Sequence, residues 1–309
     1  MKKLMLFLLG VLFVAIISYF LNVGIFKHKT SNLSANNKLQ VTASFYPLYF
    51  FASQIGGDKV EVKNITPSGA EPHDYEPTAQ DMARIEKSNL LILNGGKLEA
   101  WGNKIKDDLK GTNISVVTTG DRLANQTVVE KGQSIQDPHI WLSPPLAKKE
   151  VQIILNALIN IDSKNKNYFT ANANKLTGEI DNLDKEYKAG LANCKQKDII
   201  TSHAAFGYLA EHLGLTQVPI SGLSPDSEPS PKQLADIADF AKKNNVKYIF
   251  FESLVSPKLS ETIASEVGAK TLVLDPIEGI SDDDIKSGIN YLTIMQSNLK
   301  NLRLALECQ

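Results

Sequence analysis

Between Asn165 and Asn193 the chain reads NKNYFTANANKLTGEIDNLDKEYKAGLAN. Apolar side chains recur in this stretch at steps of three and four residues, the period of one face of an α-helix. They are Phe169, Ala173, Leu176, Ile180, Leu183, Tyr187 and Leu191. No proline interrupts the run, so we expect one helix on the order of 40 Å long, at about 1.5 Å per residue. A stiff helix of this length can connect two domains, and it argues against large opening and closing motions.

Short apolar segments alternate with helical patterns on both sides of this helix, which is typical of α/β domains with parallel sheets. Four strands are expected before it, at Leu39–Phe45, Val60–Ile65, Leu90–Asn94 and Ile114–Thr118. Four more are expected after it, at Asp198–Ser202, Gln217–Ile220, Val246–Phe251 and Thr271–Leu274. A chain of 309 residues also exceeds the usual size of a single hydrophobic core. We therefore predict an α/β protein of two similar lobes joined by one long rigid helix.

These patterns divide the chain into five segments. They are an N-terminal membrane anchor or signal segment (1–27), a polar linker (28–38), a first lobe (39–164), the connecting helix (165–195) and a second lobe (196–309). The last apolar pattern, from Asp282 to Leu306, predicts a single amphipathic helix that begins after Ser281. Serine is a favoured residue at the N-cap of a helix.

The composition is that of a soluble globular protein and argues against a nucleic-acid-binding protein. Hydrophobic residues make up 43% of the chain and charged residues 22%, as in a soluble globular protein. The 33 basic and 34 acidic residues nearly cancel, and no stretch concentrates lysine and arginine as a nucleic-acid-binding surface does. We therefore expect no nucleic-acid partner.

The N-terminus departs from this soluble profile. Lys2 and Lys3 precede an apolar run of 23 residues from Leu4 to Phe26. A bilayer-spanning helix needs about 20 apolar residues, whereas the apolar core of a secretory signal has about 7 to 15. The run has no small-residue cleavage site, so we expect an uncleaved anchor that places the rest of the chain outside the cytoplasm. Cleavage, which would give a secreted or periplasmic protein, stays open.

Cys194 and Cys308 are the two cysteines of the sequence. In an oxidising compartment outside the cytoplasm, an even pair of cysteines can form a disulfide. Two unrelated thiols remain the alternative, because the sequence does not fix the distance between the two Cα atoms.

Three of the five histidines lie at the ends of expected strands or in loops: His73, His139 and His203. An α/β sheet presents its ligand-binding residues at such places. Neutral imidazole is a preferred zinc ligand, and three imidazoles with one carboxylate complete a tetrahedral shell. Glu71 and Asp74 flank His73 and are candidates to orient its ring. Each histidine taken alone is also compatible with a capping or surface role.

From about Gln40 to the C-terminus the chain resembles the metal-binding subunits of bacterial zinc and manganese ABC importers, a family that includes lipoprotein adhesins. The resemblance rests on four segments that occur in the family's order. They are Pro72–Pro77 (PHDYEP), Asp137–Leu142 (DPHIWL), Thr201–Tyr208 (TSHAAFGY) and Leu274–Gly279 (LDPIEG).

The resemblance implies a metal buried between the lobes, held by His73 and His139 from the first lobe and by His203 and a carboxylate from the second. Glu278 is the predicted carboxylate, with Asp275 as the alternative. Manganese-type relatives have glutamate where this chain has His203 and aspartate as the fourth ligand. The third imidazole therefore favours Zn²⁺ over Mn²⁺.

The function implied by the resemblance is high-affinity zinc binding outside the cytoplasm and delivery of the ion to an ABC transporter permease in the cell membrane. Such a protein is expected to be a monomer and not an enzyme. Neither an H-E-x-x-H motif nor a G-x-S-x-G motif occurs. A manganese-binding importer subunit and an adhesin-like surface protein with a structural metal are the alternatives. Unlike many zinc-type relatives, the chain has no histidine between Ala124 and Gln136.

Overall fold

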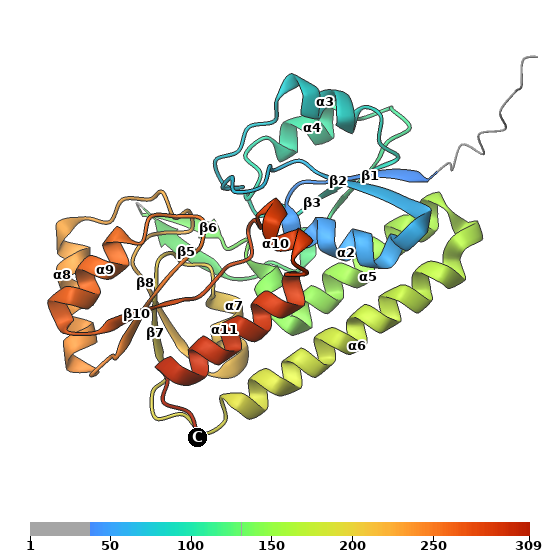
Figure 1. Ribbon diagram of the computed structural model, residues 1–309. Helices are drawn as coiled ribbons and strands as arrows, with labels where there is room; N and C mark the ends of the chain where they lie inside the picture. The colour runs from blue at the N-terminus through green and yellow to red at the C-terminus, as the bar shows by residue number, and fades with distance from the viewer. Residues whose placement is uncertain (1–37, 131) are drawn as a thin grey trace, which may run out of the picture. The chain divides into compact units, whose positions relative to one another are not determined.

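The computed structural model describes residues 38–130 and 132–309, which belong to one compact unit (Figure 1). The predicted N-terminal anchor or signal segment and nearly all of the polar linker lie outside these residues. Among the helices of the described residues, none is both long enough and apolar enough to span a bilayer.

The first four predicted strands form one parallel sheet in the order β2-β1-β3-β4. Their bounds are β1 (Leu39–Ala43), β2 (Val60–Asn64), β3 (Leu90–Leu93) and β4 (Ser115–Thr118). All four residues of β3 are buried, as expected for a central strand with helices on both faces. The helices of this lobe are α2 (Tyr46–Gly56), α3 (Ala79–Ile85), α4 (Gly102–Asp108) and α5 (Pro144–Ile161).

The last four predicted strands form a second parallel sheet in the order β10-β9-β7-β8. Their bounds are β7 (Asp198–Thr201), β8 (Thr216–Pro219), β9 (Tyr248–Phe251) and β10 (Lys270–Val273). The helices that accompany them are α7 (Gly207–Leu213), α8 (Pro231–Lys243) and α9 (Lys258–Val267). Numbered along the chain within each lobe, both sheets have the order 2-1-3-4, so the predicted pair of similar α/β lobes is confirmed.

The predicted connecting helix is α6 (Lys166–Gly190), which runs along the lower right edge of the molecule in Figure 1. Its apolar face is buried against α2, α5 and α11. The hydroxyl of Tyr187 on this helix donates to the backbone oxygen of Met295 at 2.7 Å. One continuous hydrophobic core includes this face together with residues of both sheets, such as Val41 and Ile199. The connection is therefore a packed one, which agrees with the predicted stiffness.

The prediction of one helix from Asp282 to Leu306 is wrong. The structure has a short helix α10 (Asp282–Lys286) and a separate helix α11 (Tyr291–Ala305). Between them Gly288 has φ of 88°, which is outside the helical region, and Asn290 caps α11 by accepting from the backbone of Leu292 and Thr293. The predicted N-cap is confirmed, because Ser281 accepts from the backbone nitrogen of Asp284.

A small antiparallel hairpin, β5 (Thr127–Glu130) and β6 (Gln133–Gln136), was not predicted from the sequence. It belongs to neither large sheet and precedes the segment that carries His139. The hairpin comes from the chain of the first lobe, and Figure 1 shows it beside the second sheet.

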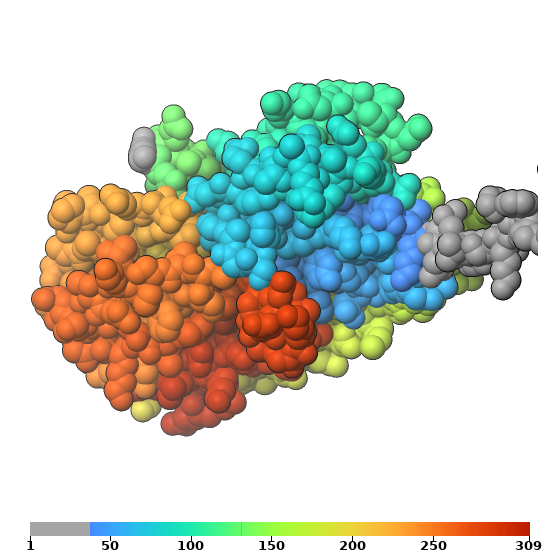
Figure 2. Space-filling view, turned by 45° about the horizontal axis from the view of Figure 1, so that its top comes forward, coloured from blue at the N-terminus to red at the C-terminus, as the bar shows by residue number. Residues whose placement is uncertain are grey.

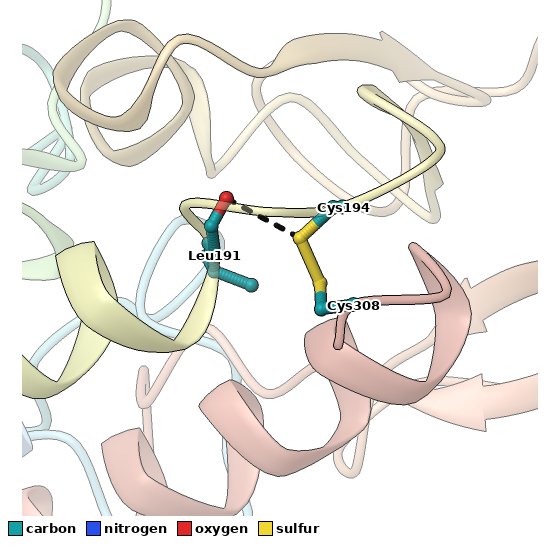
Figure 3. The surroundings of a disulfide bond; sticks show 3 residues. All are labelled: Leu191, Cys194 and Cys308. Atoms are coloured by element: carbon teal, nitrogen blue, oxygen red, sulfur yellow. Dashed lines mark hydrogen bonds between the residues drawn. A yellow bond between two sulfur atoms is a disulfide. The ribbon is translucent and has the colours of Figure 1, made fainter.

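Cys194 and Cys308 form a disulfide (Figure 3). Cys194 follows the end of α6, and Cys308 follows the end of α11. The bond therefore links the segment just after the C-terminal end of the connecting helix to the C-terminal segment of the chain. Two backbone hydrogen bonds reinforce the same junction, from Gln196 to Leu306 and from Gln309 to Asn193, both at 3.1 Å.

Candidate metal centre

Four loops bring three imidazoles and one carboxylate together. His73 lies between β2 and α3, His139 between β6 and α5, His203 two residues after β7, and Glu278 in the loop after β10. Each offers one donor atom, and these four atoms all lie within 4.8 Å of one another. The two lobes therefore contribute two side chains each to one group, which we call the His₃Glu cluster.

Five of the six separations between the donor atoms of the His₃Glu cluster are close to those of a tetrahedral zinc site. The Nε2 atom of His139 lies 3.2 Å from the Nε2 atoms of both His73 and His203. Glu278 Oε1 lies 3.3, 3.1 and 3.4 Å from the Nε2 atoms of His73, His139 and His203. With metal–ligand bonds of about 2.0–2.1 Å, the ligand atoms of a tetrahedron are about 3.3–3.4 Å apart. The donors fit zinc in both kind and spacing.

The cluster is almost closed to solvent. The side chains of His139 and His203 are fully buried, and that of Glu278 is 1% exposed. The side chain of His73 is 8% exposed, so solvent reaches the cluster at this ligand.

Two buried carboxylates orient two of the rings. Asp137 Oδ1 lies 2.7 Å from His139 Nδ1, and Glu252 Oε1 lies 2.7 Å from His203 Nδ1. A carboxylate at Nδ1 favours the tautomer that donates there, which leaves the Nε2 lone pair facing the cluster. Two such lone pairs and the Glu278 oxygen would repel one another unless a cation or a proton lies between them.

Opposing effects act on the charges of the cluster. Burial alone would raise the pKa of Glu278, but His203, His139 and His73 around it hold that pKa well below its usual range. Burial lowers the pKa of His73. Burial also disfavours charge on His203, yet Glu252 and Glu278 raise its pKa well above the ordinary value. These directions describe an ion pair between the Glu278 carboxylate and the His203 imidazole, and a divalent cation would replace the imidazole proton as the partner of that carboxylate.

The residues beside His73 do not orient its ring as the sequence suggested. Glu71 instead accepts from the backbone nitrogen of His73 at 3.2 Å. Burial, and then the charge of Glu278, raise the pKa of Glu71 to about 9, so this carboxyl is protonated near neutral pH. Asp74 is exposed. Within the part of the chain that the structure describes, neither side chain is hydrogen-bonded to the His73 imidazole.

Asp275, the alternative carboxylate, lies outside the cluster and shapes the loop that leads to Glu278. Its Oδ1 accepts from the backbone nitrogen of Ile277 at 2.7 Å, and its Oδ2 accepts from the Ser253 hydroxyl at 2.6 Å. Ile277 has φ of 60°, a conformation that a β-branched residue rarely adopts. The bond from Asp275 stabilises this turn, which directs Glu278 into the cluster.

Hydrogen bonds between the ligand-bearing loops hold the lobes together around the cluster. The indole nitrogen of Trp141 donates to the backbone oxygen of Pro276 at 2.7 Å, which joins the loops of His139 and Glu278. The hydroxyl of Tyr291 donates to the backbone oxygen of Trp141 at 2.6 Å. At the periphery, Ser68 donates to the backbone oxygen of Ile280 at 2.9 Å.

Glu252 was not identified from the sequence, although it follows the apolar strand Tyr248–Phe251 at the sheet edge where His203 also lies. We expect Glu252→Gln to lower the affinity for zinc about 10-fold or more, because substitutions of such outer partners typically cost about 10–100-fold. Chelator competition measures the change, with Glu228→Gln as a control on an exposed glutamate. Equal affinities of the two variants would show that the Glu252 carboxylate does not support His203.

Comparisons with known proteins agree with the fold. The family model described as "Zinc-uptake complex component A periplasmic" matches residues 41–305. The high-affinity zinc uptake system protein ZnuA of Bacillus subtilis is 39% identical over 289 residues, which are 90% of this chain and 91% of that protein. The zinc-binding lipoprotein AdcA of Streptococcus pneumoniae is 39% identical over 280 residues, and the match spans 56% of its length.

A solved structure extends this likeness to three dimensions. The Zn(II)-bound ZnuA-like domain of Streptococcus pneumoniae AdcA superposes with a TM-score of 0.76 at 39% identity, covering 87% of this chain and 99% of that domain. The two-lobe architecture is thus shared, and the resemblance predicted from the four sequence segments is confirmed. The chain belongs to the family of zinc-uptake complex component A, whose members are solute-binding transport proteins.

Proposed function

We propose that this chain is the extracytoplasmic zinc-binding subunit of an ABC importer and that it delivers the ion to a permease in the cell membrane. His73, His139, His203 and Glu278 hold one zinc ion between the first lobe (39–164) and the second (196–309). The observation that carries the proposal is the five donor separations of 3.1 to 3.4 Å that join His139 Nε2 and Glu278 Oε1 to each other and to the other two donors. The names of the relatives support zinc as the transported ion.

The donor set favours zinc over manganese. Imidazole suits zinc, whereas manganese prefers oxygen ligands in an octahedral arrangement. The cluster supplies three nitrogens and one oxygen at tetrahedral spacing, and its burial leaves little room for additional water ligands. A manganese-binding importer subunit is therefore the weaker candidate.

The closed donor set also favours a carrier over an enzyme. Catalytic zinc sites have three protein ligands and keep the fourth position for water or substrate. Here four protein donors surround the metal position and leave none for water or substrate. Zinc is therefore the transported ion and not a catalytic cofactor. The disulfide supports a location outside the cytoplasm, where such bonds persist. A single chain supplies the whole cluster, which supports a monomer as the binding unit.

The test is a competitive titration of residues 38–309 with zinc and with manganese against chromophoric chelators. We expect one tightly bound zinc per chain and manganese binding at least about 100-fold weaker, a difference of about 2.8 kcal/mol. Absence of tight zinc binding would refute the proposal, and tighter manganese binding would replace zinc with manganese. Circular dichroism of the metal-free chain tests the alternative of an adhesin-like protein with a structural metal. A structural zinc is needed for folding, so an unfolded metal-free chain would favour that alternative.

A further inference from the structure

The hairpin formed by β5 and β6 bridges the two lobes next to the cluster. Its root is attached to Tyr208 of α7, whose buried hydroxyl accepts from the backbone nitrogens of Asn125 and Gln126 at 3.0 and 3.1 Å. The same hydroxyl donates to the backbone oxygen of Asp137 at 3.0 Å. Figure 2 shows the green atoms of the hairpin region beside the amber surface of the second lobe.

At the far end of β5, the carboxylate of Glu130 accepts from the backbone nitrogen of Leu223 in the second lobe. Gly222, the residue before Leu223, allows the Glu130 carboxylate to come this close. A Cβ atom at position 222 would collide with that carboxylate. A hydrogen bond that a backbone N–H donates to a charged carboxylate is stronger than one between neutral groups. Glu130 is thus a specific contact between the lobes.

The segment that Glu130 contacts is attached to the backbone on both sides of His203. Ser221 donates to the backbone oxygen of Ser202 at 2.8 Å, and Ala204 donates to the backbone oxygen of Gly222 at 2.8 Å. Fixing Leu223 therefore restrains the loop that presents His203. Zinc cannot leave a four-donor cluster until at least one ligand moves away, so this restraint acts on release of the ion.

We propose that Glu130 is a positioning residue that slows the release of zinc by holding the His203 loop of the second lobe against the hairpin of the first. The inference rests on the proposed zinc-binding function and adds to it a residue that touches no donor atom. Because the contact restrains the His203 loop while the four donors surround the ion, we expect its loss to accelerate dissociation much more than it slows association.

The test is stopped-flow measurement of zinc dissociation from the full chain into excess chelator, together with the association rate. We expect Glu130→Ala to release zinc about 10-fold faster, the loss typical of a hydrogen bond to a charged group. The association rate should change less than about twofold. Glu130→Gln should have a smaller effect, because its amide oxygen still accepts from Leu223 without a charge. The matched control is Glu228→Ala, which removes an exposed negative charge from the same region.

Unchanged dissociation in both Glu130 variants would overturn the inference while leaving the proposed function in place. Equal acceleration in Glu228→Ala would also overturn it, since the effect would then be one of surface charge. Failure of the unaltered chain to bind zinc would overturn the proposed function and the inference together. The exchange rate of the Leu223 amide hydrogen measures the contact with Glu130 directly. We expect this exchange to be faster in Glu130→Ala, in the metal-free chain as well.

Discussion

Replacing His139 with alanine is expected to lower the affinity for zinc by more than about 100-fold while the metal-free fold is retained. His139 is the central donor of the cluster, with its Nε2 atom 3.1 to 3.2 Å from the other three donor atoms. Loss of an outer partner of a ligand already costs about 10–100-fold, so loss of the ligand itself should cost more. The substitution also leaves Asp137 buried without its imidazole partner.

The measurement is zinc affinity by chelator competition, with far-ultraviolet circular dichroism to follow the fold. His212→Ala is a suitable control, because His212 lies on α7 with its Nε2 atom 2.6 Å from Asp184 and outside the cluster. Zinc affinity within about 10-fold of the unaltered chain would show that His139 is not a ligand. Collapse of the helical signal in the metal-free variant would mean that its role is structural.

Replacing both cysteines with serine is expected to lower the free energy of unfolding by about 2–5 kcal/mol. Cys194 and Cys308 are 114 residues apart, so the disulfide closes a loop that includes nearly the whole second lobe. A cross-link over a long loop restricts the unfolded chain strongly, and the entropic model places the effect of such a loop near the upper end of that range.

Chemical denaturation in urea, followed by circular dichroism on the metal-free chain, measures this change. The unaltered chain under reducing conditions is the control, and it should lose a similar amount of stability. A double variant as stable as the oxidised chain would show that the backbone hydrogen bonds around Gln196 and Gln309 already fix this junction.

The strands and the connecting helix could be predicted from the sequence for one physical reason, which is that each has a local pattern of apolar residues. A parallel strand covered on both faces is a short apolar run, as in β3, and the helix that follows has a separate period of about 3.6 residues. The connecting helix has six buried side chains on one face at regular spacing, and it begins one residue after the predicted segment 165–195 and ends five residues before the end of that segment. Patterns of this kind are local, so a single sequence contains them.

The features that the sequence did not predict have two origins, which are local signals hidden by a stronger pattern and contacts between distant segments. The break before α11 follows from Gly288 and from the Asn290 cap, two local signals that the apolar spacing concealed. Glu252 lies 49 residues from His203 and becomes its partner only because β9 and β7 are neighbours in the sheet. The convergence of His73, His139 and His203 likewise follows from the fold, and the resemblance to a known family was needed to anticipate it.

The most direct measurement is a crystal structure of the zinc-loaded chain with anomalous diffraction data collected on both sides of the zinc absorption edge. The account expects one zinc peak per chain, with the Nε2 atoms of His73, His139 and His203 and one oxygen of Glu278 about 2.0–2.1 Å away. A zinc peak at another place, or one bound by Asp275 in place of Glu278, would contradict it.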